Sequence, residues 1–250
     1  MNHQELSPII LDFTELLRYV GANKVEMTPK QGLVPLRHIK AMMEMFQVKE
    51  VHEEAVGDKI FKKRDELEYS RFYFLDLLAI SGGFLKINRK NVLVKGPYWE
   101  SYFSTHLSER GFLLFHAFRY GFDFDNWLLR GSDFGEQVCE KSEMIWFHLL
   151  LWRDGQSVDW RPWAENVIKS CKIRWNSIDQ SFAIDLASWG LERCFVQALE
   201  YFGLVETERI GGEFKKLKSV RLNAVGRDYF NRILGHSGHF LEGISPFSLN

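Results

Sequence analysis

The stretch ELEYSRFYFLDLLAISG, residues 66–82, is followed directly by GFLKINRKNVLVKGP, residues 83–97. In the first segment apolar residues recur near the helical period, which predicts a helix. Gly82-Gly83 ends this helix, because glycine tolerates the left-handed conformation of a helix cap. Apolar and polar residues then alternate on both sides of the polar turn 88–91, which predicts a β-hairpin. Gly96-Pro97 opens a further helix, so the order is helix, glycine, hairpin, helix.

The same order returns near the other end of the chain. WGLERCFVQALEYF, residues 189–202, has the pattern of an amphipathic helix, and Gly203 ends it. Two extended runs, 204–207 and 219–222, predict a second hairpin, and residues 223–234 predict a last helix. Gly83-Phe84-Leu85 and Gly203-Leu204-Val205 stand 120 residues apart. One supersecondary unit repeated at this separation indicates duplication of a domain.

A helix, a glycine stop, a strand-turn-strand wing and a further helix is the order of a winged helix. Residues 202–206 (FGLVE) and 220–227 (VRLNAVGR) resemble the "LGLVE … RLTPLGR" ending that is common in winged-helix domains. Residues 25–33 (VEMTPKQGL), together with 84–103, resemble a family of uncharacterised prokaryotic tandem winged-helix proteins. The resemblance spans roughly residues 20–235 as a pattern. It implies a helix-turn-helix fold and no established activity.

We therefore expect a mostly α fold with short β-hairpins, in which two winged-helix-like units flank a Trp-rich helical middle. The expected segments are an N-terminal winged-helix-like domain, 1–107, an aromatic-rich helical middle, 108–188, and a C-terminal winged-helix-like unit with a flexible tail, 189–250. The C-terminal unit also uses helices from the middle. The tryptophans of the middle stand at helical spacing, which favours a core over a base-stacking platform.

Composition narrows the function classes. Hydrophobic residues make up 46% and charged residues 26% of the chain, and 32 Lys+Arg against 33 Asp+Glu give a net charge of −1. This balance gives no whole-chain argument for a polyanion or an anionic membrane as partner. No window approaches the roughly 18 uninterrupted apolar residues of a membrane-spanning helix. Without a signal peptide or a CxxC pair, we expect a cytoplasmic protein without disulfides.

The wings are the most informative charged features. A basic hairpin can lie against phosphates, where lysine and arginine displace counterions. Lysine on a hairpin equally serves solubility and blocks edge pairing, and the sequence does not separate these two uses. The candidate nucleic-acid-binding residues are Lys86, Arg89, Lys90 and Lys95 in the first wing, and Arg209, Lys215, Lys216, Lys218 and Arg221 in the second, where residues 209–221 hold one acid, Glu213.

The helices that precede the wings are poor candidates for reading the major groove. Acidic residues repel the DNA backbone and accept hydrogen bonds only from cytosine. Packing or a protein partner is the favoured use of these helices. Their acids are Glu66, Glu68 and Asp76 against Arg71 in the first helix, and Glu192 and Glu200 against Arg193 in the second.

Catalytic patterns are missing from the sequence. It contains no GxxxxGK[ST], GxGxxG, GxSxG or HExxH motif, so we expect no enzyme, cofactor or metal. His236 and His239 have HxxH spacing, but they stand in a Gly/Ser-rich tail that favours flexibility over a metal site. The basic cluster 59–64 is bracketed by acids and indicates a solvated segment. We thus expect a non-enzymatic, nucleic-acid-associated or regulatory protein that contacts duplex DNA. The alternative is a protein-interaction module that docks a partner or a second copy.

Overall fold

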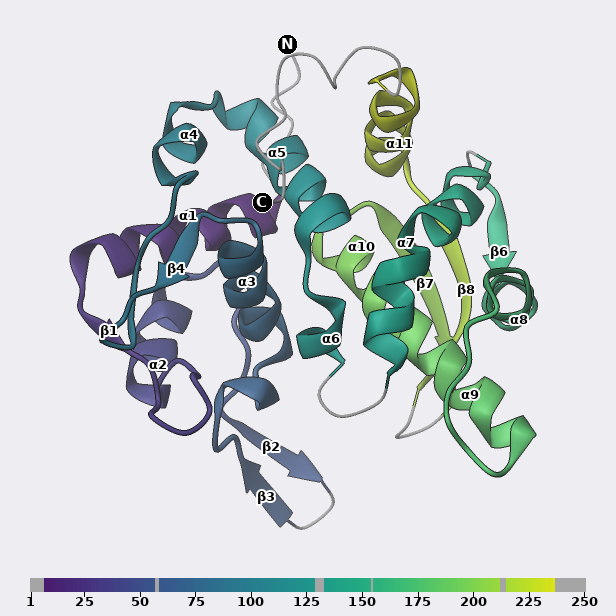
Figure 1. The fold of residues 1–250 in the computed structure, drawn as a ribbon, viewed down its shortest axis with the longest axis horizontal. Coiled ribbons are helices and arrows are strands. Elements are labelled where there is room, and N and C mark those ends of the chain that lie inside the picture. The colour runs from purple at the N-terminus through teal and green to yellow at the C-terminus, as the bar shows by residue number, and fades with distance from the viewer. Residues whose placement is uncertain (1–6, 57–58, 129–132, 154, 212–214, 237–250) are drawn as a thin grey trace. The chain divides into compact units, whose positions relative to one another are not determined.

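The computed structural model describes residues 7–56, 59–128, 133–153, 155–211 and 215–236. The chain forms two compact units, Met1–Asp123 and Phe124–Asn250, which are described one at a time (Figure 1). Both units consist mostly of helices with small antiparallel sheets, which confirms the expected mostly α class with short hairpins. Among the described residues, no helix has the length and apolar character that crossing a membrane requires.

Unit 1 contains one three-stranded sheet and one separate hairpin. The sheet has the order β1-β5-β4, so the short strand β1 pairs with the second strand of the predicted hairpin, with Val25 opposite Leu93. The elements are α1 (Pro8–Ala22), β1 (Val25–Glu26), α2 (Leu36–Met45), β2 (Glu53–Val56), β3 (Lys59–Lys62), the 3-10 helix η1 (Glu66–Glu68), α3 (Ser70–Ser81), β4 (Leu85–Ile87), β5 (Val92–Lys95), α4 (Trp99–Ser104) and α5 (Leu107–Gly121).

Unit 2 repeats the three-stranded sheet, and its described residues contain no counterpart of the hairpin β2–β3. Its sheet has the order β6-β8-β7, and again a short strand pairs with the second hairpin strand, with Val158 opposite Val220. A π-helical turn, η2, joins α9 to α10 in one nearly continuous helix. The elements are α6 (Phe124–Trp127), α7 (Phe134–Leu150), β6 (Ser157–Asp159), α8 (Trp160–Cys171), α9 (Gln180–Leu191), η2 (Glu192–Val196), α10 (Gln197–Tyr201), β7 (Val205–Ile210), β8 (Lys216–Leu222) and α11 (Ala224–His236).

The glycine stops work in the same way in both units. Gly83 and Gly203 have φ angles of +69° and +70°, and the next residue in each case donates its backbone N–H to a carbonyl five residues back, at 2.9 Å. A second glycine follows the hairpin. A Cβ at Gly96 would lie 2.3 Å from the carbonyl oxygen of Gly83, and one at Gly226 would lie 2.2 Å from that of Leu204. Only glycine allows these close backbone approaches.

The predicted aromatic cores are present. In unit 1, Phe13, Phe84 and Tyr102 are buried with ring centroids 5.3–5.8 Å apart. In unit 2, Trp146 packs edge-on against Phe195 at 5.6 Å, and both side chains are buried. The core interpretation is thus confirmed for four tryptophans of the middle: Trp127, Trp146, Trp152 and Trp160.

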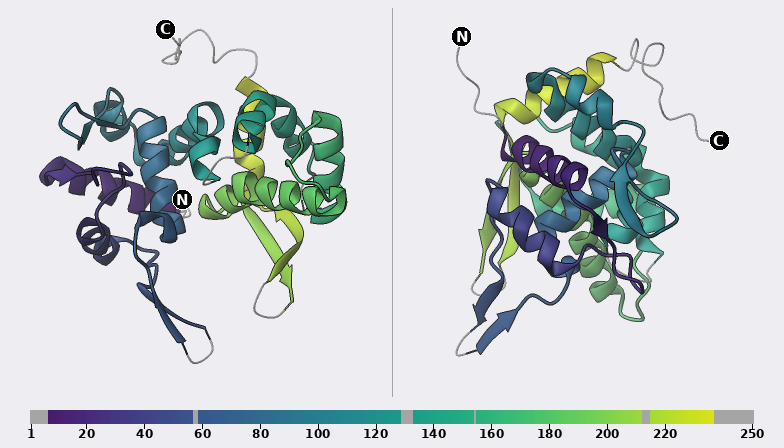
Figure 2. Two further views of the ribbon diagram at one scale, coloured as in Figure 1. Left: turned by 60° about the horizontal axis from the view of Figure 1, so that its bottom comes forward. Right: turned by 90° about the vertical axis from the view of Figure 1, so that its left-hand side faces the viewer.

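Two features differ from the sequence expectation. The helical middle does not stand apart as a segment 108–188, because α5 belongs to unit 1 and the following helices belong to unit 2. The basic cluster 59–64 is exposed along residues 59–62, as expected for a solvated segment, but it unexpectedly includes strand β3, which pairs with β2 in a hairpin that extends beyond the helices of unit 1 (Figure 2). The expected flexible tail, 237–250, lies outside the described residues.

Candidate nucleic-acid interface

The first wing is a rigid turn that carries exposed cations. Asn88 holds the turn, since its side-chain Oδ1 accepts hydrogen bonds from the backbone N–H of Lys90 at 2.9 Å and of Val92 at 3.1 Å. Asn91 adopts a left-handed φ of +56°. Lys86, Arg89 and Lys90 are exposed, and none of them forms an ion pair with a described residue. The first wing therefore presents three uncompensated positive charges, two on the turn and one on strand β4.

Lys95 at the base of the first wing is held differently. Its Nζ lies 3.3 Å from Glu100 Oε1 and 4.9 Å from the centroid of the Trp99 ring. Glu100 is an exposed residue of α4, so this pair is weak. Lys95 is nevertheless partly neutralised, whereas the other three cations of the first wing are not.

In the second wing, Arg209 turns toward the preceding helix. Its guanidinium lies 2.5 Å from Glu192 Oε1 and 3.0 Å from Glu200 Oε2. Burial opposes the charge, yet hydrogen bonds and the charges of both glutamates hold the pKa of Arg209 above its ordinary value. Two acids already compensate this arginine, and a phosphate would have to displace them.

Two other cations of the second wing pair along the hairpin. Glu206 stands opposite Arg221 in the strand register, and their side chains form an ion pair. Lys218 Nζ lies 2.7 Å from Glu208 Oε1. Among the candidate residues of this wing, only Lys215 and Lys216 are exposed without an ion pair to a described residue.

The helix before the first wing, α3, is unavailable for DNA because it is buried. Acidic residues on its surface are not the reason. Residues 71–79 of α3 are all buried. Arg71 forms a buried ion pair with Asp12 of α1 at 2.8 Å. Glu66 and Asp76, expected as exposed acids, lie in the interior of unit 1. The spacing alone gives no sign of this, since charged residues seldom lie in a core.

Glu66 and Asp76 form a buried carboxyl pair. Glu66 Oε2 accepts a hydrogen bond from the backbone N–H of Val34 at 2.5 Å, while Glu66 Oε1 and Asp76 Oδ1 have no hydrogen-bond partner. Burial, and then the nearby charge of Asp76, raise the pKa of Glu66 well above its ordinary range. Burial raises the pKa of Asp76 to about 6. One proton is therefore held between these two groups near neutral pH.

The helix before the second wing exposes aromatic residues. Phe182 and Trp189 lie seven residues apart on the outer face of α9 and are 55% and 46% exposed. Asp185 between them is paired with Arg161 of α8. Between Phe182 and Trp189, α9 carries one acid and no basic side chain, so this face does not suit approach to the DNA major groove.

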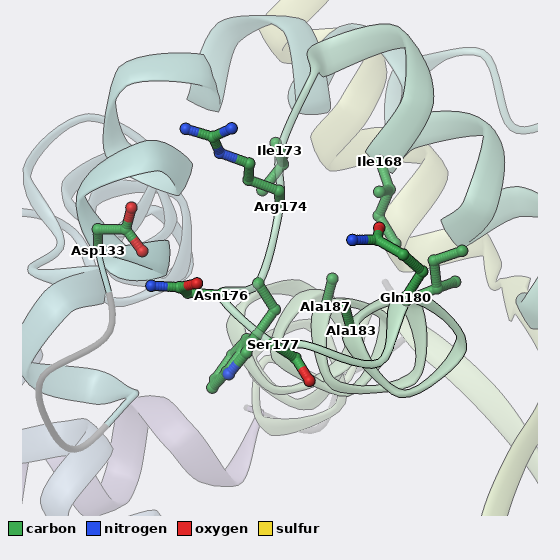
Figure 3. Close-up of a pocket in the computed structure, with 11 residues that line it drawn as sticks. Asp133, Ile168, Ile173, Arg174, Asn176, Ser177, Gln180, Ala183 and Ala187 are labelled. Carbon is green, nitrogen blue, oxygen red and sulfur yellow. The ribbon is translucent and has the colours of Figure 1, made fainter.

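Unit 2 also contains an open cleft of about 400 Å³ (Figure 3). It lies between the α8–α9 connection and α9, with Ala183 and Ala187 of α9 in its wall. Asp133 and Arg174 bring opposite charges to its rim, but no nucleophile stands beside a base. The cleft can accept a small molecule or a side chain, and it lacks a catalytic arrangement.

Histidines and metal ligands give no further site. His148 is partly buried and shares a hydrogen bond with Ser170 at 3.0 Å. Within the described ranges no three His, Cys, Asp or Glu residues gather as a metal site. The side chain of His236, and all of His239, lie outside the described residues. The expectation of no metal therefore stays a prediction.

Compared with protein-family models, curated proteins and solved structures, the chain has no significant match to any of them.

Proposed function

We propose that both units are winged-helix-like domains and that the chain is a non-enzymatic protein that binds nucleic acid through its wings. The element order supports the domain proposal. Both units contain the order helix, strand, helix, helix, hairpin, although unit 1 has the additional hairpin β2–β3 before its third helix. In each sheet the first strand pairs with the second hairpin strand. The matching glycine stops and close backbone contacts at Gly96 and Gly226 add a second, independent similarity between the units.

The observation that carries the binding proposal is the uncompensated charge of the first wing. Arg89 and Lys90 stand on a turn fixed by Asn88, Lys86 stands on the preceding strand β4, and residues 86–95 contain no acid. A rigid basic loop contacts phosphates without a large ordering cost. Lys215 and Lys216 add two similar charges in unit 2.

This arrangement supports contact with the backbone rather than reading of the base sequence. Residues of α3 are buried, and α9 presents Phe182 and Trp189. Phosphate contacts position a protein on DNA but carry no sequence information. We therefore expect similar affinity for duplexes of different sequence, and a strong dependence on salt.

Fluorescence anisotropy on labelled duplexes at several salt concentrations tests this proposal. Three phosphate contacts from the first wing predict a log–log slope of about −2.7, and contacts from both wings predict about −4.5. The double variant Arg89→Glu/Lys90→Glu should weaken binding at least tenfold and reduce the slope by about 2. Absence of salt-dependent binding by the unaltered protein would contradict the proposal.

A matched control separates the wing from bulk charge. Lys49 and Lys169 are exposed, belong to neither wing hairpin and make no ion pair with a described residue. Lys49→Glu/Lys169→Glu changes the net charge as much as the wing variant does. Equal loss of binding in both variants would show a general charge effect and would overturn the assignment to the wing.

The second candidate function is a protein-interaction module, and the outer face of α9 favours it. Phe182 and Trp189 are large, exposed and on one helix face, and Ile178 just before the helix is fully exposed. Aromatic side chains of this kind are typical of protein interfaces. If no duplex binds the unaltered protein at low salt, this function replaces the first.

A further inference from the structure

The cleft of unit 2 combines apolar walls with polar side chains that have no partner. Six of its eleven lining residues are apolar, and its volume of about 400 Å³ lies within the range of small-molecule sites. None of the polar lining side chains forms a hydrogen bond or an ion pair with a described residue. These polar residues are Asp133, Arg174, Asn176, Ser177 and Gln180.

The segment that carries most of these groups is held in place by its backbone. Lys172 caps the C-terminus of α8 in the left-handed conformation, with a φ of +55°. The side chain of Gln137 in α7 then holds the backbone of Arg174: its Oε1 accepts from the N–H at 3.1 Å, and its Nε2 donates to the carbonyl at 3.1 Å. Asp179 caps the N-terminus of α9 through its side chain. A ligand would therefore have to order side chains only, which limits the entropic cost of binding.

Trp175 supplies a flat ring in the wall of this cleft. It is half-buried, and its ring centroid lies 4.9 Å from that of Phe134 and 6.2 Å from that of Trp189. Contacts with two other aromatic rings fix the position of the indole. Aromatic side chains stack on nucleobases of any identity, because every base has a π-face. The wall is thus suited to a planar ligand ring.

The polar groups match the other parts of a nucleotide. Asn176 and Gln180 each offer a donor and an acceptor, and base edges present the complementary pattern. In Figure 3 the carboxamide of Asn176 points toward Asp133, and Gln180 lies on the other side of the cleft. Arg174 is exposed and without an ion pair to a described residue. A guanidinium of this kind binds a phosphate through two parallel hydrogen bonds.

We propose that this cleft binds a single nucleotide, with the base beside Trp175, the carboxamides on the base edge and the phosphate on Arg174. Asp133 brings a negative charge to the same cleft, which opposes the entry of further phosphates. The ligand therefore carries one phosphate, either as a free nucleoside monophosphate or as an unpaired nucleotide of a single strand. No residue of either wing lines the cleft, so this site does not rest on the proposed binding through the wings.

NMR titrations with AMP, GMP, CMP and UMP test the proposal, since they measure affinities into the millimolar range. At least one monophosphate should bind with a dissociation constant below about 1 mM. Its nucleoside and inorganic phosphate should each bind at least tenfold more weakly, because each makes only part of the contacts. A single-stranded trinucleotide is titrated in parallel. Binding of the trinucleotide alone assigns the site to a strand, and equal binding of both assigns it to free nucleotides. Failure of both to bind overturns the proposal.

Variants separate the site from general attraction of anions. Arg174→Gln should weaken nucleotide binding at least tenfold and leave nucleoside binding within twofold. Lys172→Gln is the matched control, because Lys172 is exposed and makes the same change in charge but does not line the cleft. It should keep nucleotide affinity within twofold. An equal loss in the two variants, or tighter binding of ATP than of AMP, would show a general charge effect and would overturn the proposal.

Two further variants test the base contact and the independence from the wings. Gln180→Ala should weaken nucleotide and nucleoside binding by the same factor, because its carboxamide contacts the base in both ligands. The wing variant Arg89→Glu/Lys90→Glu should bind the monophosphate as the unaltered chain does. Circular dichroism checks that each variant is folded. Loss of monophosphate binding in the wing variant would place the nucleotide at the wing and would overturn the assignment to the cleft.

Discussion

Replacing Asp76 with asparagine should stabilise unit 1 at neutral pH, although it changes a buried polar group. Asp76 is buried beside Glu66, and its Oδ1 has no hydrogen-bond partner. Its neighbour is another carboxyl. Ionisation of Asp76 therefore places a negative charge beside a second acidic group, in an interior where even one charge is unfavourable. Asparagine has nearly the same shape, cannot ionise and can donate a hydrogen bond to Glu66.

The expected stabilisation, and the pH range over which it develops, follow from the pKa of Asp76. Burial raises this pKa from the ordinary 3.8 to about 6. A folded-state pKa above the unfolded value means that the folded protein holds the proton more tightly. The resulting stability is complete below about pH 4 and is lost as the pH rises through about 6. A difference of about two pKa units corresponds to about 3 kcal/mol. Asp76→Asn removes this loss. The free energy of unfolding of the variant, relative to that of the unaltered chain, should therefore increase by about 3 kcal/mol across that pH range.

Denaturant unfolding followed by circular dichroism at pH 4, 5, 6 and 7.5 measures this difference. Comparing the variant with the unaltered chain at each pH cancels the titration of the carboxylates that do not interact with Asp76. Glu66 is the exception, because the charge of Asp76 helps to raise its pKa. Asp12→Asn is a matched control with the opposite sign, because it breaks the buried pair with Arg71 and should cost about 3 kcal/mol at neutral pH. If Asp76→Asn destabilised the protein equally at pH 5 and pH 7.5, Asp76 would have no raised pKa and the reasoning would fail.

Two further changes test the local packing. Gly226→Ala places a Cβ 2.2 Å from a backbone carbonyl and should destabilise unit 2 by about 3 kcal/mol or more in thermal unfolding, whereas Gly155→Ala, with open space around a left-handed φ, should cost only about 1 kcal/mol. Equal effects would contradict the close contact at Gly226. Arg209→Gln leaves Glu192 and Glu200 without their cation and should destabilise unit 2 by about 1–2 kcal/mol while DNA affinity stays within twofold, measured by unfolding and anisotropy. A large loss of affinity in this variant would make Arg209 a phosphate contact after all.

Local sequence patterns were sufficient to predict the helices and strands that local chemistry determines. The glycine stop at 82–83 and the alternation in 84–94 predicted helix α3 and strands β4 and β5. The glycine stop at 203 and the extended runs 204–207 and 219–222 predicted strands β7 and β8, and all of these elements are confirmed. Strand β1 was not predicted, because two residues carry no period and its partner, Leu93, lies 68 positions away. Strand β3 was missed because its sequence, Lys-Ile-Phe-Lys, does not alternate between apolar and polar residues, and all four residues are exposed.

The electrostatics of the second wing show why a count of basic residues does not predict a binding surface. Counting residues 209–221 gave five cations against one acid, but the compensating acids lie outside that window, on the opposite strand and on the preceding helix. A hairpin register that pairs Val205 with Leu222 also pairs Glu206 with Arg221, so this ion pair could have been predicted once the strands were placed. The pair of Arg209 with Glu192 depends on how the helix packs on the hairpin, and no local pattern contains that information. Charges of the first wing, between residues 86 and 90, have no such opposite acid. For that reason the proposed interface rests on the first wing.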